Sequence, residues 1–163
     1  MSGSLIASKI KKYSIVIFLL GVVAIIYTAT QFGEKSPIVI SGQVKIDKQL
    51  QNEANGITTL FIIIFDAESS APMPFGAYKD RISLSDATED GILKKFIITR
   101  EKLQVMFPDK AFPDVINVKA RLDIDGIAGR DQDGDFVGFL NKVKLGSTDI
   151  EVVIAEKISE PPS

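Results

Sequence analysis

The sequence contains no cysteine and no histidine. Without cysteine, the chain can form no disulfide bond, no thiolate metal site and no covalent haem attachment. Without histidine, a Ser-His-Asp or Cys-His site cannot be built, and the commonest general base near neutral pH is missing. Copper sites of the cupredoxin kind fail as well, since they need two histidines and a cysteine. We therefore expect a protein that is not an enzyme and holds no cofactor.

An excess of positive charge is also missing. The chain has 19 basic and 21 acidic side chains, which give a net charge of -2, and no basic patch is interleaved with aromatic residues. The electrostatic field that attracts nucleic acid is therefore absent. We expect the protein to bind no nucleic acid and, because no catalytic constellation stands out, no small-molecule substrate.

Charge of either sign is absent from one long segment, Tyr13 to Thr30. Eighteen helical residues cover about 27 Å, close to the ~30 Å hydrocarbon core of a bilayer. Lysines crowd its N-terminal side, which favours a cytoplasmic N-terminus. We predict a single-pass anchor in the bacterial inner membrane: residues 1–12 cytoplasmic, a transmembrane helix at 13–31, a linker at 32–37, and a periplasmic remainder. A cleaved export signal and a buried helix of a soluble domain are the alternatives.

The remaining chain alternates apolar and polar residues with the period of a β-strand. In residues 116–124, for example, aliphatic side chains alternate with Asn117, Lys119, Arg121 and Asp123, which predicts one buried and one polar face. Turn-forming residues separate the segments. Seven strands are predicted, at residues 37–47, 58–67, 74–83, 92–99, 116–124, 136–145 and 149–155.

Helical signals are minor and fall around residues 47–53, 85–90 and 100–106. An α/β fold would need long amphipathic helices, so seven short strands favour a sandwich or a partly open barrel. We predict an all-β fold, an antiparallel β-sandwich of about seven strands, over residues 38–158. Residues 159–163 form a C-terminal tail.

The segment 58–67 is apolar on both faces. Leu60, Ile62 and Ile64 share one face, whereas the other carries Phe61, Ile63 and Phe65. The outer face of a sandwich strand normally meets water, so this second face needs a cover. A loop such as 106–114, a partner protein and the membrane surface are the candidates. We name Phe61, Ile63 and Phe65 as candidate partner-binding residues.

An acidic stretch, "DIDGIAGRDQDGD" at residues 123–135, is called the Asp-Gly loop below. Its aspartates suggest calcium, with Asp131, Asp133 and Asp135 as candidate ligands. An EF-hand loop fits poorly, because the glycine precedes the third acidic residue and the twelfth position is Lys142. We favour the alternative, in which the Asp-Gly pairs form turns and the aspartates accept hydrogen bonds from loop amides.

A set of turn and core positions in residues 38–158 forms a recognisable pattern: Gly42, Val44, Met73, Pro74, Ala120, Arg121, Gly126, Gly134, Asp135 and Gly138. In these positions the chain resembles the C-terminal periplasmic domain of the membrane-anchored apocytochrome chaperone of system I cytochrome c maturation. The resemblance covers most of residues 38–158, but the tetratricopeptide repeats of that family are missing here. It implies a non-enzymatic assembly domain that works beside c-type cytochromes.

We expect an accessory subunit of a respiratory or photosynthetic electron-transfer complex that contains a c-type cytochrome. The alternatives are an assembly factor for c-type cytochromes and a calcium-dependent binding module. Partners would be membrane lipid, integral membrane proteins and a cytochrome or redox subunit. Besides residues 60–65, three places are candidates for partner contacts. Gly21 and Ala24 have small side chains that allow close helix packing. The "MPFGAY" segment offers the apolar side chains of Met73, Phe75 and Tyr78, and the Asp-Gly loop offers negative charge.

Overall fold

The computed structural model describes residues 36–70 and 73–159. The transmembrane helix predicted at residues 13–31 lies outside them. Helical structure in the described part is limited to one 3-10 turn, η1 (Leu84–Asp86). No helix in this part of the chain is both long enough and apolar enough to cross a bilayer. The predicted all-β class is confirmed.

Nine strands form the regular structure of the described residues. The seven longer ones coincide with the seven predicted segments to within two residues, and the two shortest were not predicted. The strands are β1 (Ile38–Ile46), β2 (Thr59–Asp66), β3 (Pro74–Arg81), β4 (Ile92–Thr99), β5 (Gln104–Val105), β6 (Val115–Asp123), β7 (Phe136–Lys144), β8 (Ile150–Ile154) and β9 (Glu156–Lys157).

Two of the three expected helices are wrong. Residues 48–56 form turns instead. Asp47 starts them by accepting a 3.0 Å hydrogen bond from the Gln49 amide, and Gly56 ends them with a φ of 92° that favours glycine. In the segment 100–106, residue Gln104 pairs with Ala77 and adds β5 to the edge of a sheet. Only the helical signal at residues 85–90 matches the structure, because η1 overlaps it.

The strands make a six-stranded sheet, ordered β5-β3-β2-β6-β7-β9, and a three-stranded sheet, ordered β4-β1-β8. All pairs are antiparallel except β1 with β8, which is parallel. The prediction of a purely antiparallel fold is therefore wrong at this pair. The parallel pair arises because the chain crosses from β7, in the larger sheet, to the smaller sheet before β8 begins.

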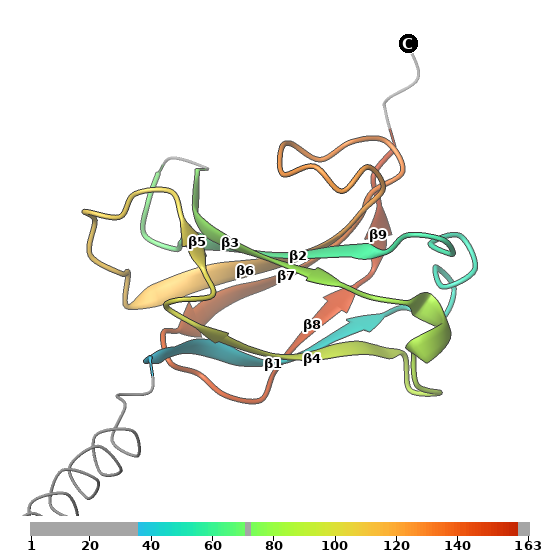
Figure 1. The fold of residues 1–163 in the computed structure, drawn as a ribbon, viewed down its shortest axis with the longest axis horizontal. Coiled ribbons are helices and arrows are strands. Elements are labelled where there is room, and N and C mark those ends of the chain that lie inside the picture. Colours follow the sequence, from blue (N-terminus) through green and yellow to red (C-terminus); the bar gives the residue numbers. More distant parts are fainter. Residues whose placement is uncertain (1–35, 71–72, 160–163) are drawn as a thin grey trace, which may run out of the picture. The chain divides into compact units, whose positions relative to one another are not determined.

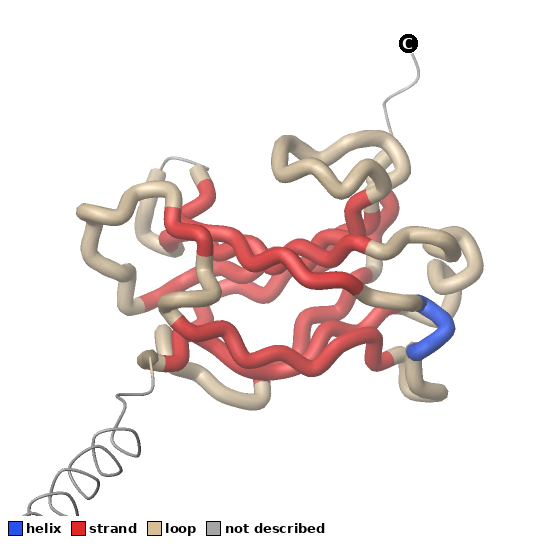
Figure 2. The backbone as a smooth tube through the Cα atoms, in the orientation of Figure 1, coloured by secondary structure: helices blue, strands red, loops and turns tan. Residues whose placement is uncertain are grey.

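The two sheets lie in two layers with the main core between them (Figures 1 and 2). Alternation along the strands supplies this core, as expected for half-buried strands. Leu60, Ile62 and Ile64 of β2 are fully buried there, and Ile40 and Val44 of β1 face them from the smaller sheet. The core thus combines aliphatic residues from strands far apart in the sequence.

The layers are joined on one side by the chain's last strands. After β8 pairs with β1, Ala155 donates a 3.1 Å backbone hydrogen bond to Val137, and β9 then pairs with β7 in the other sheet. This crossing brings the backbones of β7 and β8 close together at Gly138. A Cβ at that position would lie 2.0 Å from the carbonyl oxygen of Val153. Only glycine fits at position 138, because the β8 backbone leaves no room for a Cβ atom.

We predict that Gly138→Ala lowers the free energy of unfolding by about 1–3 kcal/mol, because β7 and β8 must separate to admit the methyl group. Gly129→Ala is the matched control, since a Cβ at Gly129 meets nothing within 4 Å. Urea unfolding of both variants measures the difference. Equal midpoints for Gly138→Ala and the unmodified chain would contradict this account of the joined layers.

Candidate functional site

The outer face of the six-stranded sheet, which points away from the main core, holds a second buried cluster. Phe61 and Ile63 of β2 are 3% and 7% exposed. Across the β2–β6 register, Phe61 lies opposite Arg121 and Ile63 opposite Lys119. Arg121 in turn lies opposite Val137 of β7. The polar face predicted for residues 116–124 is therefore buried, and the expectation of one polar, solvated face is wrong.

The Asp-Gly loop lies over the outer face of the six-stranded sheet (Figure 1), and its backbone contacts this cluster. Two cations link the loop to the apolar face. The Arg121 guanidinium lies 5.1 Å from the Phe61 ring centroid, and the Lys79 ammonium lies 5.4 Å from it. Loop carbonyls then accept hydrogen bonds from both cations, Gly126 from Lys79 at 2.6 Å and Gly129 from Arg121 at 2.9 Å. The cover that the apolar second face needs comes from within the chain, although from a different loop than 106–114.

Arg121 is the centre of the cluster and is only 1% exposed. Its guanidinium is 2.7 Å from a carboxylate oxygen of Asp123, 3.3 Å from Asp131 and 3.8 Å from Asp135. The Nε atom is buried without a hydrogen-bond partner, since its distance to Asp135 is too long for one. One cation therefore holds three carboxylates that lie at the start, middle and end of the Asp-Gly loop.

The aspartates also bind the loop backbone. Asp123 accepts hydrogen bonds from the amides of Gly126, at 2.6 Å, and Ile127, at 3.1 Å. Asp135 accepts them from Ile124, at 3.1 Å, and Gln132, at 2.9 Å. This confirms the prediction that the Asp side chains satisfy loop amides. Gly126 has a φ of 73°, in the left-handed region where glycine is favoured.

A second cation binds the middle of the loop. Lys119 is 7% exposed, and its ammonium bonds both carboxylate oxygens of Asp131. The same ammonium lies 5.2 Å from the centroid of the Phe139 ring. Lys119 and Arg121 thus grip Asp131 from two successive outward positions of β6. Buried charges are tolerated when they are paired and hydrogen-bonded in this way.

The environments of these carboxyl groups shift their pKa values in opposite directions. Burial raises the pKa of Asp123 above 3.8, despite the opposing charge of Arg121. For Asp131, burial is again the largest influence, but the hydrogen bond and charge of Lys119, supported by Arg121, lower the pKa below 3.8. The pKa of exposed Asp125 is lowered by hydrogen bonds from the Ile127 amide and the Gln132 side chain.

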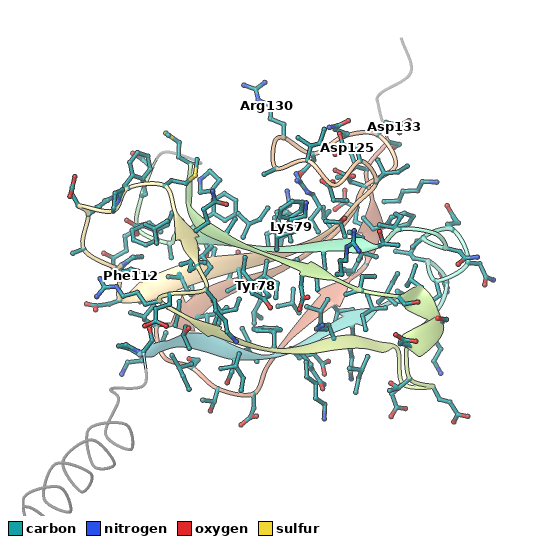
Figure 3. All side chains as sticks on the ribbon, viewed as in Figure 1. Tyr78, Lys79, Phe112, Asp125, Arg130 and Asp133 are labelled. Atoms are coloured by element: carbon teal, nitrogen blue, oxygen red, sulfur yellow. The ribbon has the colours of Figure 1, made fainter. Side chains whose placement is uncertain are left out.

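The candidate calcium ligands have other roles in the described structure. Asp131 pairs with Lys119 and Arg121, and Asp135 with loop amides and Arg121. Asp133 projects from the loop near its end (Figure 3). Among residues 36–70 and 73–159, no group of three acidic, histidine or cysteine side chains is arranged to hold a metal ion. The buried ion pairs hold the loop against the sheet. They are called the ionic clamp below and consist of Lys119, Arg121, Asp123, Asp131 and Asp135.

The other predicted docking residues are not brought together. Gly21 and Ala24 lie outside the described residues, and Phe65 is half-buried at the end of β2. Met73 is 54% exposed, whereas Phe75 is buried with its ring centroid 4.7 Å from that of Phe112 in the loop 106–114. Tyr78 is half-buried and donates a 3.0 Å hydrogen bond to Asp80. Whether these positions bind a partner stays a prediction.

Sequence reasoning missed Lys119, Arg121 and Lys79 as members of the site. The signal was present in the outer face of residues 58–67. If that face is apolar and covered, then the neighbouring residues across the sheet must be covered with it. Arg121 follows from this argument, because antiparallel pairing of 58–67 with 116–124 places Phe61 beside it. A buried Arg121 needs an anionic partner, and the five aspartates that follow in the sequence would predict ion pairs with it.

A separate hollow of about 480 Å³ lies on the outer face of the three-stranded sheet. Its lining mixes Gln43, Lys95 and Ile97 with the backbone of Gly42. It is open to solvent and holds no paired carboxylates. It lies on the opposite layer from the ionic clamp, so the two features are independent surfaces.

Comparison with protein-family models, with curated proteins and with solved structures returns no match to this chain.

We predict that Arg121→Met lowers the free energy of unfolding by about 3–5 kcal/mol, because it leaves Asp123 and Asp135 buried without their cation. Arg130→Met is the control, since Arg130 is exposed on the same loop and points away from the sheet (Figure 3). Thermal unfolding of both variants measures the effect. A small loss for Arg121→Met would show that the buried cluster does not hold the loop.

The lowered pKa of Asp131 predicts part of the acid sensitivity. Its carboxylate stabilises the fold above the unfolded value of 3.8, and this contribution is lost as the pH falls through the lower folded pKa. The stability of Asp131→Asn should therefore depend less on pH below about 4 than that of the unmodified chain. Urea midpoints measured against pH test this, with Asp109→Asn in another exposed loop as control. Parallel curves for Asp131→Asn and the unmodified chain would contradict it.

Proposed function

We propose that the protein is a non-catalytic binding module, tethered to the bacterial inner membrane, that serves as an accessory subunit of an electron-transfer complex containing a c-type cytochrome. The observation that carries the binding role is the Asp-Gly loop. This loop is fixed by a buried ionic clamp, although a loop with no role beyond connecting two strands needs no such device.

Burying charged side chains is costly. Removing Lys119, Arg121, Asp123 and Asp135 from water costs several kcal/mol for each ion, and apolar residues of similar size are often as stable or more so. The benefit of such a cluster is that its ion pairs hold the loop in one position. Pre-organised loops on rigid sheets are the usual places for recognition, because little conformational entropy is lost when a partner binds.

The loop presents a mixed surface. Ile124 and Ile127 are 59% and 64% exposed, and Asp125 and Asp133 are exposed beside them. Apolar residues supply contact area, and carboxylates steer a basic partner toward it. A basic cytochrome surface is the complement that these side chains favour. The link to c-type cytochromes comes from the sequence resemblance, which also motivates the alternative role in cytochrome assembly.

The proposal is tested by extracting membranes with mild detergent and identifying comigrating proteins on native gels by mass spectrometry. We expect comigration with one redox complex at constant stoichiometry. Migration as a free monomer would overturn the subunit role. Transient, substoichiometric association with cytochrome maturation proteins would replace it with the assembly role.

Two point variants test the docking surface. Ile127→Ser should weaken comigration, because it removes an exposed apolar side chain from the Asp-Gly loop. Ile97→Ser should leave comigration unchanged, since Ile97 is similarly exposed, at 56%, on the outer face of the other sheet. Neither side chain is buried, so both variants should fold. The reverse result would place the docking surface on the three-stranded sheet and contradict the loop assignment.

A further inference from the structure

One end of the domain carries an exposed apolar patch. Met73, Met106 and Phe107, called the entry-end patch, are 54%, 58% and 40% exposed. Met73 and Phe107 border a hollow of about 170 Å³ that is also lined by Pro74 and Phe75. The Met106 amide donates a 2.9 Å hydrogen bond to the carbonyl of Phe75, which lines the hollow, so the backbone of the third residue lies next to it. The three residues therefore form one surface.

This patch lies at the end of the domain where the described chain begins. The Pro37 carbonyl accepts a 3.2 Å hydrogen bond from the Arg100 amide, and the Arg100 guanidinium lies 4.5 Å from the Phe112 ring centroid. Phe112 contacts Phe75 in the wall of the hollow. Figure 3 shows Phe112 at this end of the sheets, away from Asp125 and Asp133 of the Asp-Gly loop. A short series of contacts thus connects residue 37 to the patch.

The sequence limits how far this end can lie from a membrane. The predicted transmembrane helix ends at residue 31, and the described domain begins at residue 36, so only residues 32–35 separate them. Four residues span at most about 14 Å when fully extended. If the predicted helix is in the bilayer, the end of the domain that carries the entry-end patch stays at the membrane surface.

We propose that the entry-end patch inserts into the headgroup region of the bilayer that holds the predicted transmembrane helix. The inference rests on the proposed membrane tether and adds a second, lipid-binding contact that fixes the orientation of the domain. The Asp-Gly loop begins at Asp123, at the far end of β6 from the entry end, and lies over the outer face of the sheet, so it stays clear of the lipid. Its carboxylates are then presented to partners above the membrane.

The chemistry of this end favours apolar insertion over attraction to anionic lipid. Methionine and phenylalanine side chains bury readily at the boundary between headgroups and acyl chains. Nearby basic residues are balanced by acidic ones, as in the 3.5 Å ion pair of Lys110 with Asp66 at the rim of the hollow. Zwitterionic lipid should therefore be sufficient for insertion.

The test uses the full chain in phosphatidylcholine liposomes, with an environment-sensitive fluorophore on single cysteines. The natural sequence has no cysteine, so each label is unique. Met106→Cys reports on the entry-end patch. Ile127→Cys is the matched control, because Ile127 is similarly exposed, at 64%, on the Asp-Gly loop. Ala24→Cys reports on the predicted transmembrane helix.

We expect the label at position 106 to show blue-shifted emission and strong quenching by nitroxide-labelled lipid, and the label at 127 to show neither. Quenching at 24 without quenching at 106 would overturn the inference while leaving the tether intact. No quenching at 24 would overturn the tether and the inference together. A blue shift at 106 without lipid quenching would mean that a second copy or another protein covers the patch, and this would also overturn lipid insertion. In a second measurement, Phe107→Ser should reduce the quenching at 106.

Discussion

A single buried guanidinium holds the Asp-Gly loop against the six-stranded sheet. Arg121 pairs with carboxylates at the start, middle and end of the loop, and its outer neighbours on the sheet are Phe61 and Val137. The apolar neighbours and the covering loop exclude water, which strengthens each electrostatic contact and makes each unpaired charge costly. The loop therefore covers the second apolar face of β2, and that face in turn shields the charges that hold the loop.

The domain exposes two different surfaces. At the entry end, loops expose Met73, Met106 and Phe107 close to the beginning of the described chain. Over the outer face of the larger sheet, the clamped loop exposes Ile124 and Ile127 among carboxylates. In our proposal the first surface meets lipid and the second meets a protein, so the fold acts as a rigid spacer that sets the height and orientation of the loop above the bilayer.

The strands were predictable because their alternation is local, and seven segments were located to within two residues. The parallel pairing of β8 with β1 was not, since it depends on a crossing between sheets that no local pattern records. The roles of the aspartates in loop turns were predictable from Asp-Gly chemistry. The burial of Lys119 and Arg121 was not, because alternation assigns charged residues to water, and only the pairing of β6 with the doubly apolar β2 reverses this assignment.

Amide hydrogen exchange in the Asp-Gly loop tests the central claim most directly. The amides of Gly126, Ile127 and Gln132 donate to carboxylates that the buried Arg121 holds in place. If the clamp fixes the loop, these amides should exchange as slowly as those of β6, because both open only when the sheet does. Exchange at the rate of an unprotected peptide, with β6 still protected, would show that the loop moves independently of Arg121 and would contradict the account.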